Sequence, residues 1–238
     1  MDRNSNIYTF IFAIVLVVVV AAMLAFTATT LKPIQENNVR NEKMQNILTT
    51  LSITAEKNAV DATFNTYIKQ QLALKADGSV DETVNAFNID LKKEIKKPID
   101  QQRFPLYIAE KDGKTFYIVP LFGTGLWDVI WGYIALEADK NTIMGAVFDH
   151  KGETPGLGAE INQKWFGDMF IGKKILKDEN LGFTAEGNFV SVTVVKGGTP
   201  DENLHGVDAI SGGTITCDAV TKMINERMSN YLPYFQNN

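Results

Sequence analysis

Residues 104–121 read FPLYIAEKDGKTFYIVPL, two runs rich in apolar residues on either side of an Asp-Gly pair. Successive side chains of a strand point to opposite faces of a sheet, so a period of two in each run predicts two half-buried strands. Asp112-Gly113 supplies the positive φ angles that a two-residue type I′ turn requires. The stretch therefore predicts an antiparallel hairpin, with a sheet as the centre of the folded domain.

A second hairpin is predicted directly after the first. The runs VIWGYIALEAD (129–139) and TIMGAVFDH (142–150) flank a short turn at Lys140-Asn141. The remaining periodic segments are a strand at 188–196, a helix at 163–176 and an amphipathic C-terminal helix at 215–232. Strands and helices in this order predict an α+β fold with a twisted antiparallel sheet and flanking helices.

The N-terminal segment has a different character. Residues 7–30 carry no charged side chain, and a helix of that length rises about 36 Å, enough for a hydrocarbon core of about 30 Å. A cleaved signal peptide is the alternative, but its apolar part usually spans roughly 7–15 residues, which favours a retained anchor. Basic residues lie on both sides of the segment, so charge does not decide its orientation. Residues 1–31 are predicted to be a cytoplasmic N-terminus and a transmembrane anchor.

Residues 32–100 are predicted to form a helical, membrane-proximal stalk. Met44, Ile47, Leu48 and Leu51 recur at helical spacing within residues 31–74. A second helix is predicted at 80–97, with acidic residues early and lysines late, and Pro98 ends it. The globular domain is then expected to cover residues 101–238.

Composition and missing motifs exclude several functions. The 238 residues have a net charge of −5 with mixed signs throughout, which offers no basic stripe for nucleic acid. The two histidines and the single cysteine do not fall at metal-ligand spacing, so no transition-metal site is predicted. The glycine motifs at 123–125 and 156–158 lack the third glycine of a dinucleotide fingerprint. No NADH site of the chain's own is therefore expected.

Small residues precede the C-terminal helix. Ser211-Gly212-Gly213-Thr214 stands where the unpaired N–H groups and the partial positive charge of a helix N-terminus would attract a phosphate. Glycines there let a phosphate approach the backbone closely. An ordinary cap, in which Ser211 or Thr214 satisfies the helix amides, explains the same residues and is the interpretation that chemistry alone favours.

The second informative loop is Glu153-Thr154-Pro155-Gly156-Leu157-Gly158, which follows the second hairpin. Pro-Gly presets a type II turn, and such a loop can lie flat against a ring system. A plain surface turn accounts for the string equally well.

The string DAISGGTIT at 208–216 resembles the flavinylation signature of the FMN-binding domain family. The resemblance implies that Thr214 is the acceptor, whose oxygen displaces AMP from FAD and keeps FMN as a phosphoester. Gly213 stands where most members have alanine, which leaves the acceptor in place. The string ETPGLG recurs beside the flavin ring in the same family, so the resemblance makes four residues ring-side candidates: Glu153, Thr154, Gly156 and Leu157.

Further strings at 125–127, 133–137, 164–166 and 170–174 resemble the NqrC family, the C subunits of the sodium-translocating NADH:quinone oxidoreductases, and the resemblance runs from the anchor to the C-terminal helix. It implies an electron-transfer subunit with covalent FMN, in a membrane complex that oxidises NADH, reduces quinone and exports Na⁺. It also implies the other subunits and a flavin transferase as partners, no catalytic side chain, and a single-pass location in a bacterial inner membrane with a periplasmic C-terminal domain. The alternatives are the G subunit of the Rnf electron-transport complex and a membrane-anchored sensor that binds a phosphate ligand reversibly.

Several single residues have two interpretations. Trp127, Trp131 and Tyr133 can stack on a flavin or fill the core, and core filling is expected for at least two of them. Lys196 can donate to the phosphate or ring, although a solvated strand end is the favoured interpretation. Cys217 is expected to be buried by packing.

Overall fold

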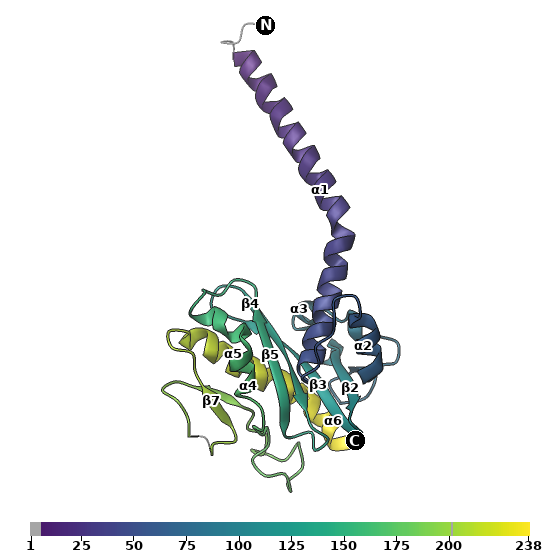
Figure 1. Ribbon diagram of the computed structural model, residues 1–238, viewed down its shortest axis with the longest axis vertical. Coiled ribbons are helices and arrows are strands. Elements are labelled where there is room, and N and C mark those ends of the chain that lie inside the picture. The colour runs from purple at the N-terminus through teal and green to yellow at the C-terminus, as the bar shows by residue number, and fades with distance from the viewer. Residues whose placement is uncertain (1–5, 201) are drawn as a thin grey trace. The chain divides into compact units, whose positions relative to one another are not determined.

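The computed structural model describes residues 6–200 and 202–238 (Figure 1). The chain divides at Lys43/Met44 into two compact units. Helix α1 (Asn6–Thr49) begins in the first unit and ends in the second. Its most apolar window has a mean hydropathy of 3.0, and among the described residues this helix alone is long and apolar enough to cross a membrane. Length and composition therefore agree with the predicted single anchor.

The second unit is built on a five-stranded antiparallel sheet in the order β1-β2-β3-β4-β5. Its strands are β1 (Ile68–Leu74), β2 (Phe104–Lys111), β3 (Lys114–Thr124), β4 (Val129–Leu136) and β5 (Ile143–His150). Both predicted hairpins are confirmed, as β2–β3 and β4–β5. Asp112 and Gly113 have φ angles of 52° and 73°, the left-handed pair that the first turn requires.

The sheet buries side chains on both faces. In β2, Leu106 belongs to one apolar cluster and its neighbour Tyr107 belongs to the other, as strand alternation demands. The cluster of Leu106 contains the apolar face of α5 (Thr214–Met228), which packs against β3 (Figure 1). The cluster of Tyr107 contains the last turns of α1 and helix α2 (Val60–Tyr67). The fold is thus α+β with helices on both faces of the sheet.

The stalk helix predicted within residues 31–74 continues only to Thr49. Ser52 takes a φ of 56°, Ser52 N–H donates to the Thr49 carbonyl, and Ile53 N–H donates to the Leu48 carbonyl. This pair of hydrogen bonds around a left-handed residue ends the helix. Met44, Ile47, Leu48 and Leu51 are buried in the cluster of Tyr107, so their helical spacing marks domain core. The compact unit therefore begins at Met44 and not at residue 101.

The prediction of a helix at 80–97 is largely wrong. Only the 3₁₀ turn η1 (Ala86–Asn88) and the four-residue α3 (Leu91–Glu94) are helical. The side chains of Asp81, Asn85 and Asp90 accept hydrogen bonds from the backbone N–H two residues further on. Asn85 and Asp90 are thereby the N-caps of η1 and α3, so two short helical pieces begin where one continuous helix was expected. A further 3₁₀ turn, η2 (Ile99–Gln101), leads into β2.

The segments after β5 agree with the prediction only in part. The helix expected at 163–176 is reduced to α4 (Lys164–Asp168), because Gly172 adopts a φ of +79° and its N–H donates to Ile143 of the sheet. The strand expected at 188–196 is reduced to β6 (Thr193–Val195), which pairs in parallel with β7 (Gly206–Asp208). The C-terminal helix is confirmed as α5, followed by η4 (Ser229–Tyr231) and α6 (Leu232–Asn237).

A buried amide joins this irregular region to the sheet. Asn141, 1% exposed, accepts hydrogen bonds through Oδ1 from Ile175 N–H at 3.0 Å and Leu176 N–H at 2.9 Å. We expect Asn141→Ala to lower the free energy of unfolding by about 2 kcal/mol, since a buried N–H loses its acceptor. Urea unfolding measures this, with Asn65→Ala on the exposed surface of α2 as the control. Equal stability of the two variants would contradict the expectation.

Candidate cofactor-binding site at the start of helix α5

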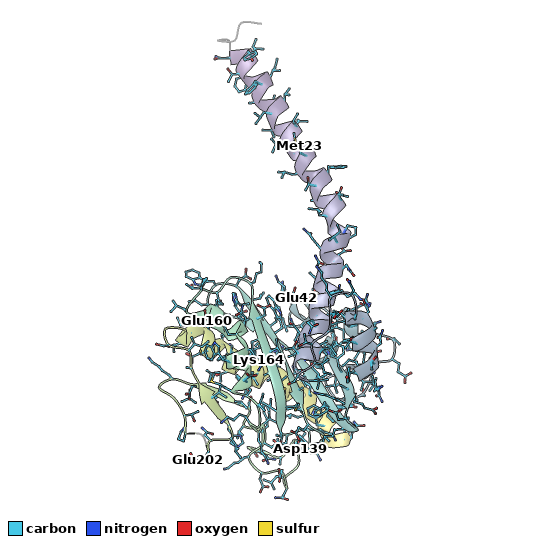
Figure 2. The ribbon with its side chains drawn as sticks, in the orientation of Figure 1. Met23, Glu42, Asp139, Glu160, Lys164 and Glu202 are labelled. Atoms are coloured by element: carbon cyan, nitrogen blue, oxygen red, sulfur yellow. The ribbon has the colours of Figure 1, made fainter. Side chains whose placement is uncertain are left out.

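A cavity of ≈ 240 Å³ lies at the N-terminal end of α5. Its walls bring together the two motifs at 153–158 and 211–214, which are far apart in the sequence. The lining residues are Leu126, Glu153, Thr154, Leu157, Gly158, Gly212, Gly213, Thr214, Ile215 and Thr216. In Figure 2 the label of Glu160 marks the 3₁₀ segment η3 (Gly158–Asn162), which follows the second motif.

Three loops form this end of the domain. The first joins β3 to β4 at residues 125–128, the second follows β5, and the third joins β7 to α5. In an antiparallel sheet the end of β3, the start of β4 and the end of β5 lie at the same edge. The topology of the second hairpin therefore places the ETPGLG loop beside the first loop, and α5 completes the cavity.

The N-terminus of α5 is open to a ligand. Gly213 is its N-cap residue, and no side chain of the described chain caps it, so neither Ser211 nor Thr214 acts as the ordinary cap. The first amides of a 15-residue helix thus carry partial positive charge toward the cavity. Gly212 has a φ of +76°, and a Cβ there would lie 2.5 Å from Leu157 Cδ2. Glycine at this position lets the two loops meet.

Glu153 lies in the cavity wall but is only 4% exposed. Its Oε1 accepts a hydrogen bond from Trp127 N–H at 3.0 Å, and its Oε2 accepts one from the Thr216 hydroxyl at 2.5 Å. Burial raises the pKa of this carboxyl group, but the Thr216 hydroxyl and the backbone N–H groups of residues 126–128 offset the burial and lower the pKa below its usual value. Glu153 is therefore an ionised group at neutral pH that ties its own loop to the 125–128 loop and to the first turn of α5.

The lowered pKa predicts a dependence of stability on pH. A carboxyl group with a depressed folded-state pKa stabilises the fold above its unfolded value of 4.5, and this contribution is lost as pH falls through the folded-state pKa. We expect the unfolding free energy of the wild type to exceed that of Glu153→Gln at pH ~6 and the difference to shrink below pH ~4.5. Urea unfolding across this range measures it. A constant difference would show that the charge of Glu153 is not involved.

The rim of the cavity is apolar and exposed. Leu126, Leu157 and Ile215 are 46%, 41% and 57% exposed, and Trp127 is 70% exposed while its indole N–H donates to Thr154 Oγ1 at 3.2 Å. Ile215 thus lies on the exposed side of the amphipathic helix α5. A polar floor with an apolar rim suits a ligand that has a charged group and an aromatic ring.

Two of the three aromatic candidates are packed into the domain. Tyr133 is 8% exposed, and the half-buried Trp131 packs against the cluster of Tyr107. The expectation of core filling for at least two of the three is therefore confirmed, and Trp127 is the one that reaches the rim. Cys217 is fully buried, also as expected.

The predicted site residues separate into two groups. Glu153, Thr154, Leu157, Gly212, Gly213 and Thr214 all line the cavity. Ser211, Gly156 and Lys196 do not belong to its lining, and Lys196 is exposed after the end of β6. Sequence reasoning missed four lining residues: Leu126, Gly158, Ile215 and Thr216. The GLW string and the second threonine of TIT were the available signals for Leu126 and Thr216.

The residues present fit an FMN group. The uncapped amides of α5 can donate hydrogen bonds to the phosphate, and the glycines before the helix let the phosphate approach the backbone. The apolar side chains of Leu126, Trp127 and Leu157 can pack against the ring. Both oxygens of the buried Glu153 are occupied by donors of the chain, so its charge is held by protein groups.

The part of the chain that forms this cavity matches an FMN-binding domain. A model of this family, the FMN-binding domain, matches residues 125–229, which include all three loops. Over 92% of its length the chain is 30% identical to the C subunit of the Na⁺-translocating NADH-quinone reductase of Haemophilus ducreyi, covering 88% of that protein. The corresponding protein of Vibrio campbellii is 29% identical over 92% of this chain and 89% of its own. The chain belongs to the NqrC family, the C subunits of the Na⁺-translocating NADH-quinone reductases.

Solved structures of this family have the same fold. The C subunit of the Na⁺-translocating NADH-quinone reductase from Parabacteroides distasonis is 38% identical and superimposes with a TM-score of 0.76, over 86% of this chain and 96% of that one. NqrC of Shewanella oneidensis is 28% identical with a TM-score of 0.71, over 83% and 96%. The family membership decides between NqrC and the Rnf relative, which the motifs alone left as alternatives.

Proposed function

We propose that Thr214 carries FMN through a phosphoester bond, and that the chain serves as the FMN-carrying electron-transfer subunit of a Na⁺-translocating NADH:quinone oxidoreductase. The observation that carries the proposal is the uncapped start of α5, where the half-buried Thr214 lines a cavity between the two predicted motifs. Membership of the NqrC family supports the assignment to this complex.

The chain contributes binding and orientation, whereas FMN supplies the electron-carrying chemistry when bound. The backbone amides at the start of α5 would hold the negative phosphate. The exposed apolar side chains of Leu126, Trp127 and Leu157 would contact the ring. No side chain of the cavity is asked to act as a nucleophile or a general base during electron transfer. Thr214 reacts once, during maturation.

Membrane attachment places the carrier within a larger assembly. The 44-residue α1 provides one span, and we place the chain in a bacterial inner membrane with the C-terminal domain in the periplasm. The proposed partners are the other subunits of the complex and a flavin transferase. A covalent bond suits a carrier outside the cytoplasm, because FMN that dissociated there would be lost. Protease cleavage of the domain in intact spheroplasts is the expected result, and full protection would contradict the orientation.

Intact-mass analysis tests the covalent bond. We expect protein produced with a flavin transferase to carry one FMN moiety, which peptide mapping locates at Thr214, and we expect flavin fluorescence to migrate with the chain in denaturing electrophoresis. Protein produced without the transferase is the control. A flavin that is released on denaturation would support a reversible phosphate-ligand module instead, and attachment at another residue would overturn the assignment of Thr214.

A further inference from the structure

Two threonines lie two residues apart at the start of α5, and they differ in exposure and in hydrogen bonding. Thr216 is 1% exposed, and its hydroxyl donates to Glu153 Oε2 at 2.5 Å. Thr214 is half-buried and lines the cavity. A hydroxyl that is buried and held by a carboxylate is not available to a modifying enzyme. The environment of the two side chains therefore distinguishes two chemically identical acceptors.

The carboxylate that holds Thr216 also holds the opposite loop. Glu153 Oε1 accepts from Trp127 N–H at 3.0 Å, so one side chain connects the 125–128 loop with the first turn of α5. Hydrogen bonds to an ionised carboxylate are the stronger class, and burial keeps water from competing for them.

Two glycines leave room for this carboxylate. A Cβ at Gly125 would lie 2.6 Å from Oε1, and a Cβ at Gly158 would lie 2.8 Å from Oε2. The backbones of two loops therefore approach the Glu153 carboxylate closely, and this contact fixes the position of the carboxylate.

We propose that Glu153 is a positioning residue for flavin attachment. By binding Thr216 it fixes the first turn of α5 so that Thr214 is the threonine presented to the transferase. In the attachment step, Thr214 Oγ forms a bond to the FMN-side phosphorus of FAD, and the anhydride P–O bond to AMP breaks. AMP leaves with the bonding electron pair, and the hydroxyl proton passes to a base of the transferase. This inference rests on the proposed covalent FMN and assigns to Glu153 a role separate from contact with the ring.

The test is the initial rate of covalent flavin incorporation into the full-length chain, measured with FAD and a purified flavin transferase. We expect Glu153→Ala and Thr216→Val to slow incorporation about tenfold, because small displacements of a reacting group have large effects on rate. Glu153→Gln and Thr216→Ser keep groups that can hydrogen bond, and we expect both to remain within about twofold of the wild type.

A double variant and a control separate positioning from stability. Glu153→Ala/Thr216→Val should be no slower than the slower single variant, because both substitutions remove the same interaction. Asp81→Ala removes another carboxylate that joins two segments, through Arg103 and Thr83, outside the cavity lining. We expect this control to lose stability while it keeps the wild-type rate of incorporation.

The outcomes are distinct. If Glu153→Ala and Thr216→Val are loaded at the wild-type rate, or if the rates of all variants including Asp81→Ala simply follow their unfolding free energies, the positioning role is overturned. If the wild type itself takes up no covalent flavin at Thr214, the proposed function fails and not merely the role of Glu153.

Discussion

Thr214→Ala is expected to abolish covalent FMN while leaving the domain folded. The Thr214 side chain does not cap α5, and alanine is the better helix former, so the free energy of unfolding should change by less than about 1 kcal/mol. Thr216 should not substitute as acceptor, because it is 1% exposed and bonded to Glu153. Flavin fluorescence in denaturing gels and peptide mapping measure the effect.

Thr214→Ser is the matched variant, because it keeps a hydroxyl at the same position of the helix. Retained flavin in Thr214→Ser and its absence in Thr214→Ala would identify the hydroxyl as the attachment point. Full covalent flavin in Thr214→Ala, at Thr216 or elsewhere, would contradict both the acceptor assignment and the protection of Thr216.

Gly158→Ala is expected to have the second largest effect. A Cβ at this position would overlap the Thr216 hydroxyl and would lie 2.8 Å from Glu153 Oε2, and both of these side chains are buried. We expect a loss of about 2 kcal/mol in the free energy of unfolding, typical of overpacking, together with slower flavin attachment. Urea unfolding and incorporation assays measure the two effects.

Gly152→Ala provides the control for the same loop. A Cβ there would meet only Asp128 Cβ, at an ordinary contact distance of 3.6 Å. We expect wild-type stability and incorporation in this variant. Equal damage from both substitutions would mean that the loop tolerates no side chain at all, and the specific contact between Gly158, Glu153 and Thr216 would lose its support.

The two hairpins of the sheet could be predicted because each pairs strands that are adjacent in the sequence. Alternating apolar residues and the Asp112-Gly113 turn are sufficient for β2 and β3, and β4 and β5 follow the same pattern. Strand β1 was not predicted, because IKQQLAL at 68–74 has no clear alternation and forms a strand only by pairing with β2. The helix expected at 80–97 is interrupted because the side chains of Asp81 and Asn85 bind the backbone two residues further on and start short turns, which helical periodicity does not reveal.

The site was predictable to the extent that short motifs could identify it. Thr214, Leu157 and Glu153 came from strings that resemble the family, and all three line the cavity. The contact between Glu153 and Thr216 could not be predicted, because it joins residues 63 positions apart through the folded sheet. The sequence also could not show whether Ser211 or Thr214 caps the helix, because capping depends on the orientation of the side chain. In the structure α5 begins without a side-chain cap.

The helix that contains the apolar segment ends inside the hydrophobic core of the folded domain. Met44, Ile47 and Leu48 of α1 are at most 1% exposed, and they pack in the same cluster as Phe64 and Tyr107. A water-soluble fragment designed by removing everything that resembles a stalk would discard these side chains and uncover the aromatic residues beneath them. Any such fragment should start upstream of Met44, because the last two turns of this helix cover the apolar residues on one face of the sheet.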